Sequence, residues 1–313
     1  MKPKPRCSVV IPTYNCLDYL PLAIASARTQ AIDDLEILVV DDGSTDGTAN
    51  WLAQEARHDR RITLLTSERK GPSFARNLAI SRASAEFIAF LDADDLWWRH
   101  KLSRQLAFHE THRNVAFSFT DYLHLDPRGA ARGSCFDYWR PGYVDRMSLD
   151  YETVENAEFE LLAANTVGTS TVVASVRALH NANGFATNSH SAQDWDLWLR
   201  LAHRGPVACS AATTMTYLIR PTSITQNHSA RIHAMRAILE GYESRVDSLA
   251  PEARRRASSR IREAEAERAR ALGDRWGAAR AHLGAFLRWP RRRVAHAAAS
   301  DLVAALLPAD AMQ

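Results

Sequence analysis

The stretch EFIAFLDADD (residues 86–95) decides the fold, because an apolar run ends there abruptly in three carboxylates. Residues 86–91, EFIAFL, are rich in β-branched and aromatic side chains, which predicts a buried strand. Asp92, Asp94 and Asp95 follow at once, and three acids at the end of a buried strand repel one another and resist desolvation. A divalent cation would relieve this, since Mg²⁺ and Mn²⁺ take carboxylate oxygens together with substrate phosphates. The other interpretation is a loop whose aspartates cap the next helix.

Upstream of this stretch, apolar strands alternate with helical segments. The predicted strands lie in SVVIPTYN (8–15), LEILVVDDG (35–43) and ITLLT (62–66), with helices at about 19–29, 48–57 and 73–81. This alternation indicates a mostly parallel, doubly wound α/β sheet flanked by helices. Ligands of such sheets bind beyond the carboxyl ends of the strands. Five side chains fall at those ends and should meet on one rim: Tyr14, Asp41, Asp42, Asp92 and Asp94.

The composition is that of an ordinary globular protein. The 313 residues are 46% hydrophobic and 24% charged, and the net charge of +3 is too small to argue for a nucleic-acid partner. No apolar run is long enough to span a bilayer, and the N-terminus lacks the apolar core of a signal peptide. We therefore expect a cytoplasmic protein whose membrane contact, if any, is peripheral. The four scattered cysteines are expected to be reduced.

From about residue 229 the composition shifts to Ala, Arg and Glu, which predicts an α-helical C-terminal appendage. Its helices are expected at about 230–248, 251–272, 274–287 and 294–307. A basic-aromatic cluster lies within it, made of Phe286, Arg288, Trp289 and Arg291 to Arg293. Such a cluster can rest on anionic lipid, or it can mark solvated helix ends.

Several ordered blocks of this sequence resemble the glycosyltransferase family 2 type, which has the GT-A fold. They are SVVIPTYN (8–15), VVDDGSTDGT (39–48), GPSFARNLAI (71–80), FLDADDLW (90–97), QDWDLWLRLA (193–202) and, more weakly, YLIRPTSIT (217–225). The resemblance implies a GT-A catalytic domain over residues 1–228. Its nucleotide-sugar-binding half would cover about 1–98 and its acceptor half about 99–228, which leaves 229–313 to the helices.

In this family the ends of the first strands border the donor nucleotide. The residues to which the resemblance gives a nucleotide-sugar contact are Pro12, Thr13, Tyr14, Asp42, Arg76, Asp92 and Arg220. The ring of Tyr14 would stack on the base, and the Asp42 carboxylate would accept hydrogen bonds from the base or the ribose. Asp41 is expected to be structural.

Asp92 and Asp94 match the DxD signature of the family. The resemblance implies that they hold Mn²⁺ or Mg²⁺, with Asp94 the first choice as direct ligand. The metal would bridge the two donor phosphates and stabilise charge on the departing diphosphate. Asp95 is expected to support this pair or to cap the following helix.

Asp194 stands at the head of a predicted helix at 192–202, where the helix dipole favours a carboxylate. The resemblance makes it the general base, whereas a simple N-cap is the other interpretation. Asp196 is the second choice for the base. Thr169 and Ser170, in a segment that leads into a strand along the acceptor cleft, are expected to contact the acceptor.

The implied function is inverting, non-processive transfer of a sugar from a nucleotide-sugar, with UDP favoured, to a hydroxyl of a saccharide or glycolipid. Bacterial-type cell-surface polysaccharide synthesis would use such an enzyme. Processive relatives generally carry membrane spans and a Gln-x-x-Arg-Trp block, which this sequence lacks. One alternative is a sugar-phosphate nucleotidyltransferase, although PTYN stands where that class has a basic, Gly-rich loop. The other is a non-catalytic nucleotide-sugar-binding or scaffold protein.

Overall fold

The chain divides into two units, each of which is described by itself. The computed structural model describes residues 4–188, 191–220, 227–243 and 251–307. The first, which we call the sheet unit, comprises Met1–Glu158, Thr166–Asn188 and Gln193–Arg220. The second, the helical unit, comprises Phe159–Asn165, Ser189–Ala192 and Pro221–Gln313. Two short segments from the middle of the chain therefore belong to the helical unit, and the expected domain boundary at residue 228 stays a prediction.

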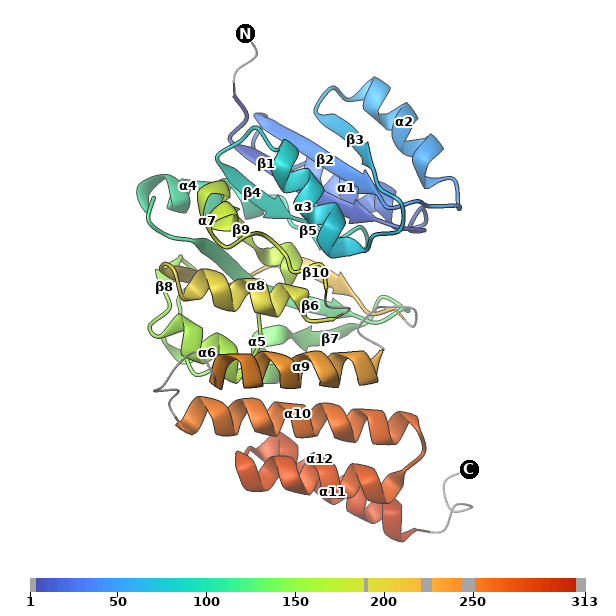
Figure 1. Cartoon of the computed structure of the whole chain (residues 1–313), viewed down its shortest axis with the longest axis vertical. Coiled ribbons are helices and arrows are strands. Elements are labelled where there is room, and N and C mark those ends of the chain that lie inside the picture. Colours follow the sequence, from blue (N-terminus) through green and yellow to red (C-terminus); the bar gives the residue numbers. More distant parts are fainter. Residues whose placement is uncertain (1–3, 189–190, 221–226, 244–250, 308–313) are drawn as a thin grey trace. The chain divides into compact units, whose positions relative to one another are not determined.

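The elements of the sheet unit are labelled in Figure 1. Its strands are β1 (Cys7–Thr13), β2 (Leu35–Asp41), β3 (Ile62–Thr66), β4 (Phe87–Phe90), β5 (Leu96–Trp97), β6 (Phe117–Leu125), β7 (Ala131–Ser134), β8 (Glu152–Thr153), β9 (Val173–Ser175) and β10 (Val207–Leu218). Its helices are α1 (Leu20–Arg28), α2 (Thr48–His58), α3 (Pro72–Arg82), α4 (Lys101–Thr111), α5 (Cys135–Trp139), α7 (Val176–Asn181) and α8 (Gln193–Ala202). Two 3-10 turns, η1 (Val144–Arg146) and η2 (Thr169–Thr171), and the helix α6 (Ala157–Ala163), which passes from one unit into the other, complete the set.

One sheet runs through the unit in the order β3-β2-β1-β4-β9-β6-β10-β5. The pairs β2–β3, β1–β2 and β1–β4 are parallel, which confirms the predicted doubly wound half. The second half is mixed, because β9 lies antiparallel between β4 and β6, and β5 lies antiparallel to β10. The sheet as a whole is therefore less parallel than the sequence pattern predicts.

The parallel register brings the carboxyl ends of β1, β2 and β4 to one edge. Thr13 lies opposite Asp41, and the amide of Asp42 donates to the Thr13 carbonyl at 2.9 Å. On the other side of β1, the amide of Leu91 donates to the Val10 carbonyl at 3.0 Å. The acids that follow β2 and β4 therefore leave the sheet on the same rim as the end of β1.

The central strands are buried on both faces. Val9, Ile11, Ile37 and Val39 have no exposed surface, and α3 packs against β1 and β2. Full burial of each such side chain stabilises the folded state by about 1.5–3 kcal/mol. A core of this kind holds the strand ends in place, so the side chains that follow them have fixed positions.

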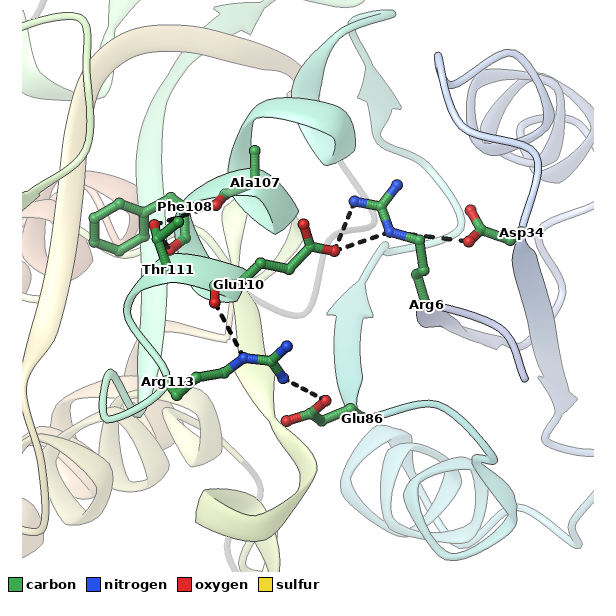
Figure 2. Close-up of polar contacts among 8 residues, drawn as sticks. All are labelled: Arg6, Asp34, Glu86, Ala107, Phe108, Glu110, Thr111 and Arg113. Carbon is green, nitrogen blue, oxygen red and sulfur yellow. Dashed lines mark hydrogen bonds and ion pairs between the residues drawn. The ribbon is translucent and has the colours of Figure 1, made fainter. Parts of the chain in front are cut away.

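The amino ends of the strands, opposite the acidic rim, carry exposed ion pairs, which Figure 2 shows. Arg6, just before β1, bonds Glu110 of α4 at 2.7 Å and lies 3.8 Å from Asp34. Arg113 bonds Glu86 at 2.6 Å, just before β4. Exposed pairs of this kind contribute only about 0–1 kcal/mol each. They join the amino ends of three strands to the end of α4, away from the acidic rim.

The helical unit contains α9 (His228–Glu243), α10 (Pro251–Ala271), α11 (Arg275–Arg288) and α12 (Arg292–Leu306). The successive pairs α9–α10, α10–α11 and α11–α12 pack on each other. Asp274 caps α11 by accepting from the Gly277 amide at 2.7 Å. None of the helices in the described part of the chain has both the length and the apolar character needed to cross a bilayer.

The predicted basic-aromatic cluster of this region does not form one surface. Arg291 and Arg293 both bond the buried carboxylate of Glu263 in α10. The guanidinium of Arg256 lies over the Trp289 ring, 5.7 Å from the centre of that ring. These side chains therefore satisfy a buried acid and pack within the unit, which composition alone does not reveal.

Candidate functional site

Residues 91–95, which follow β4 and which we call the acidic loop, form a tight turn on the rim. The amide of Asp95 donates to the Asp92 carbonyl at 3.1 Å, and β5 begins at the next residue. Asp95 is almost fully buried, whereas the side chains of Asp92 and Asp94 retain 30% and 17% of their exposure. The two carboxylates of the predicted metal pair therefore still reach the solvent side of the rim.

Each of these two carboxylates is paired with an arginine. Arg76, from α3, places Nη2 2.5 Å from Asp92 Oδ1. Arg220, just after β10, places Nη2 2.5 Å from Asp94 Oδ2, and its guanidinium lies 4.8 Å from the ring centre of Tyr19. Both arginines that are predicted to contact the nucleotide-sugar thus lie at the acidic loop.

Ionisation of Asp94 and Asp95 in this loop is unfavourable. Burial raises the pKa of the Asp94 carboxyl and the nearby charge of Asp92 raises it further, while Arg220 opposes both effects. Burial first, and then the charges of Asp92 and Asp94, hold the pKa of Asp95 well above its usual range. The local field at this loop therefore favours an added positive charge.

The residues present fit a divalent cation that a ligand completes. Within the described ranges, no three His, Cys, Asp or Glu side chains converge as a ready-made metal cage. Mg²⁺ commonly uses only one or two carboxylates plus substrate phosphates, and Asp92 and Asp94 supply those. Among the described residues, four buried polar atoms at this rim also lack a hydrogen-bond partner: Thr13 Oγ1, Arg76 Nε, Asp95 Oδ1 and Arg220 Nε. Their free hydrogen-bonding capacity suits a polar ligand.

The turn η2 connects this loop to Asp194. The hydroxyl of Ser170 accepts from the Asp92 amide at 2.9 Å and donates to Asp95 Oδ2 at 2.5 Å. The neighbouring Thr169 donates to Asp194 Oδ2 at 3.3 Å. Ser170 is only 1% exposed. The expected contacts of Ser170 and Thr169 with the acceptor stay predictions. In this structure the Ser170 hydroxyl faces the acidic loop, and Thr169 directs its hydroxyl to Asp194.

Asp194 lies in the first turn of α8, where its Oδ1 accepts from the Trp195 amide at 2.7 Å. Burial raises the pKa of its carboxyl, while the charge of Arg76 lowers that pKa and the charge of Asp92 raises it. Electrostatic coupling to both of them agrees with a position at the acidic loop. Asp196, the second choice for the base, is instead bonded to Arg200 on the same helix at 2.7 Å.

The predicted nucleotide-side residues lie along the ends of β1 and β2. Pro12 and Thr13 are buried, and Tyr14 is 40% exposed beneath the guanidinium of Arg69, at 4.8 Å. Asp41 accepts from the Ser44 amide at 3.2 Å, in agreement with a structural role.

Asp42 holds the loop between β3 and α3. Its carboxylate accepts from the Ser67 hydroxyl at 2.6 Å and from the amides of Lys70 and Gly71 at 2.9 and 2.7 Å. A carboxylate has about four acceptor positions, so one remains for a ligand. Its contact with a base or ribose stays a prediction, and the loop-holding role was missed.

Sequence reasoning also missed a clamp beneath Arg76. Asn77 exchanges two hydrogen bonds with the backbone of Phe185, each 2.8 Å long. The Phe185 ring lies 5.2 Å from the Arg76 guanidinium. Gly184 makes this possible, because it has φ +62° and a Cβ there would lie 2.4 Å from Asn77 Oδ1. The tripeptide Asn183-Gly184-Phe185 was the available signal.

Comparison with known proteins identifies the type of domain. Residues 8–158 match the model of glycosyl transferase family 2. An uncharacterized glycosyltransferase of Rickettsia felis is 31% identical over 202 residues, which are 64% of this chain and 31% of that protein. The UDP-Glc:alpha-D-GlcNAc-diphosphoundecaprenol beta-1,3-glucosyltransferase WfaP of Escherichia coli is 39% identical over 116 residues, which are 37% of this chain and 45% of that protein. The aligned region thus spans less than half of either relative.

Solved structures have the same fold at low sequence identity. Staphylococcus aureus TarS 1–349 in complex with UDP-GlcNAc matches with a TM-score of 0.60 and 17% identity, over 90% of this chain and 91% of that one. The mannosyltransferase PcManGT of Pyrobaculum calidifontis, in complex with GDP-Man and Mn²⁺, matches with a TM-score of 0.61 and 21% identity, over 98% and 82%. Residues 8–158 thus match glycosyltransferase family 2, and the sheet has the GT-A-type fold.

Proposed function

We propose that this protein is an inverting glycosyltransferase that moves a sugar from a nucleoside-diphosphate sugar to an acceptor hydroxyl, with Asp194 as the general base. The observation that carries the proposal is the turn η2. Its consecutive residues Thr169 and Ser170 bond Asp194 and the acidic loop, respectively. A base and a charge-binding loop held by one short turn suit a reaction in which a proton is removed on one side and a diphosphate departs on the other.

The chemistry follows from the side chains on the rim. Asp194, ionised, takes the proton of the acceptor hydroxyl as that oxygen bonds to the anomeric carbon of the sugar. The bond from that carbon to the diphosphate oxygen breaks, so the configuration at the carbon is inverted. Arg76 and Arg220 lie where they can stabilise the departing diphosphate. A divalent cation held by Asp92 and Asp94 would supply further charge stabilisation on the leaving side.

The names of similar proteins support the class of substrate. The E. coli relative is named for a UDP-Glc donor and a lipid-diphosphate-linked acceptor, and the S. aureus structure contains UDP-GlcNAc. We therefore propose a UDP-sugar donor and a saccharide or glycolipid acceptor, as in cell-surface polysaccharide synthesis. A cytoplasmic location is part of the proposal, and the burial of all four cysteines agrees with thiols that stay reduced.

Asp194→Asn should retain donor binding and lose most turnover. Removal of a general base typically lowers the rate by roughly 10²–10⁴-fold. The measurement is slow hydrolysis of a panel of nucleotide-sugars, each with Mn²⁺, with Mg²⁺ and with a chelator, together with calorimetric binding of the best donor. We expect one donor to be hydrolysed, in a metal-dependent manner.

Asp196→Asn is the matched control, because Asp196 lies two residues further along α8 and bonds only Arg200 among its described contacts. The Asp196→Asn variant loses an i,i+4 ion pair worth about 0.5 kcal/mol, and the enzyme should keep its activity. The wild-type rate should fall as pH is lowered through the raised pKa of Asp194, because the protonated carboxyl cannot accept a proton. Near-normal turnover in Asp194→Asn would exclude Asp194 as the base. If every donor binds and none is turned over, the scaffold alternative is correct.

A further inference from the structure

Helix α11 of the helical unit exposes three large apolar side chains in a row. Trp276, Leu283 and Leu287 retain 49%, 52% and 72% of their surface. Together with Arg280 they are spaced four, three and four residues apart, so all four lie on one side of the helix. We call these four residues the α11 stripe. Single exposed apolar residues are common, but aligned ones form a patch that indicates a binding partner.

The chain around this stripe has a strong charge bias. Residues 275–307 contain six arginines and one acid, Asp301. Asp301 is buried and is bonded by Arg270 and by His282, both at 2.6 Å. No acidic side chain within α11 or α12 therefore faces water, and the nearest exposed acid before them is Asp274, the N-cap of α11. Arg280 and Arg288, which both belong to α11, are exposed.

These two observations select one kind of partner. A helix with Trp and Leu on one side, arginines beside them and no acids is suited to lie in the headgroup region of an anionic bilayer. A second copy of the chain fits less well, because a symmetric contact would bring the arginines of both α11 helices together. We propose that the α11 stripe docks on anionic lipid, with its apolar side chains between the headgroups and Arg280 and Arg288 near lipid phosphates.

The inference concerns a surface of the helical unit and does not depend on sugar transfer. The test is therefore a binding assay that needs no donor. The full chain is sedimented with phosphatidylcholine vesicles, with and without phosphatidylglycerol, at low and at high salt. We expect binding to the phosphatidylglycerol vesicles alone, and weaker binding as salt screens the charges.

Arg280→Gln with Arg288→Gln tests the charges. Each arginine near an anionic surface contributes roughly a fivefold increase in affinity, so the pair should weaken binding by about 30-fold. The matched control is Arg255→Gln with Arg268→Gln, which removes the same charge from two exposed positions of α10. That control should bind within a few-fold of the wild type.

Leu283→Gln with Leu287→Gln tests the apolar stripe. Removal of two exposed leucines from the lipid contact should lower binding by more than about tenfold at every salt concentration. Leu22→Gln with Leu149→Gln is the control, since those leucines are 61% and 65% exposed in the sheet unit. Circular dichroism checks that all four double variants remain folded.

Three results would overturn the proposal. The wild type could fail to sediment with anionic vesicles. The α10 control could lose as much affinity as the α11 pair, which would indicate net charge rather than a surface. Sedimentation equilibrium could show a dimer that the leucine pair dissociates, in which case the stripe binds a second copy. An inactive but vesicle-binding protein would contradict the proposed function alone.

Discussion

Ser170 is the residue on which the geometry of the site depends. Its hydroxyl is the partner of the Asp92 amide and of one Asp95 oxygen, and the other Asp95 oxygen has no hydrogen-bond partner in the described part of the chain. Its carbonyl accepts from Trp97 Nε1 at 2.7 Å. Because the hydroxyl orients the loop that carries both proposed metal ligands, we expect it to act on the metal through that loop.

Ser170→Ala should therefore raise the Mn²⁺ concentration needed for half-maximal activity by about 10–100-fold, as expected for groups that orient metal ligands. It should also lower the free energy of unfolding by about 1–3 kcal/mol, since two buried groups lose their partner. The measurements are Mn²⁺ titrations of activity and urea denaturation.

Ser118→Ala is the control for stability without a role at the loop. Ser118 is also fully buried, and its hydroxyl bonds Gln105 at 3.0 Å and His109 at 2.9 Å. The Ser118→Ala variant should lose a similar amount of unfolding free energy to Ser170→Ala, and its Mn²⁺ midpoint should stay at the wild-type value. If both variants shift the midpoint equally, Ser170 has only a structural role.

At this scale the sequence predicted residue types better than side-chain directions. Asp92 and Asp94 could be chosen because acids at strand ends are chemically conspicuous, whereas Asp194 was chosen through the family resemblance of its block. The inward direction of Ser170 could not be predicted, because a short 3-10 turn has no long periodicity from which burial can be read. The clamp of Asn77 on Phe185 was missed because it joins positions 108 residues apart, and such a contact leaves no local pattern in the sequence.

At the scale of elements, helix α4 buries the amino group of Lys101. Lys101 is 1% exposed, and its Nζ donates to Gln105 Oε1 at 2.7 Å and lies 4.6 Å from the Trp97 ring centre. Burial lowers the pKa of Lys101 from 10.5 to about 7. The unfolded chain therefore keeps a proton that the folded chain releases near neutral pH.

This difference sets the sign of a pH effect on stability. Between pH 7 and 10.5 the unfolded state binds more protons at this site, so the free energy of unfolding should rise with pH. Between pH 7 and 8.5 the gain from Lys101 is about 1.5 kcal/mol. Lys101→Met should lack this increment, and urea denaturation at both pH values measures it.

The comparison stays below pH 8.5, because burial raises the pKa of Cys7 to about 12 and unfolded thiols ionise above that range. Groups that do not interact with Lys101 affect both proteins equally, so the difference between the two slopes reports Lys101 together with its coupling to Cys7 and His109. Equal slopes in wild type and variant would show that Lys101 keeps its charge in the folded state.

The elements themselves were largely predictable. The strand at 62–66 occurs with the predicted bounds, because alternation and apolar periodicity are local properties. The position of β9 was not predictable, since Val173–Ser175 is too short to show a period and pairs with strands far away in sequence. The mixed half of the sheet depends on that strand.

At the scale of the whole molecule, the helical unit is more than a C-terminal appendage, because residues 159–165 from the middle of the chain belong to it. Arg256 of α10 holds this segment. It bonds Glu160 at 3.1 Å, and its guanidinium lies 5.9 Å from the Phe159 ring centre. The side chains of the ion pair are only 13% and 16% exposed, so the pair is shielded from solvent.

Arg256→Gln should lower the free energy of unfolding by about 2–4 kcal/mol, because it leaves the Glu160 carboxylate without its charged partner in a shielded position. Arg255→Gln, one residue earlier and exposed, should change it by less than about 0.5 kcal/mol. Adding Glu160→Gln to Arg256→Gln should restore part of the loss, since it removes the unpaired charge. Urea denaturation followed by circular dichroism measures all three variants. If Arg256→Gln costs no more than Arg255→Gln, the ion pair does not anchor residues 159–165, and these residues are held by apolar packing alone.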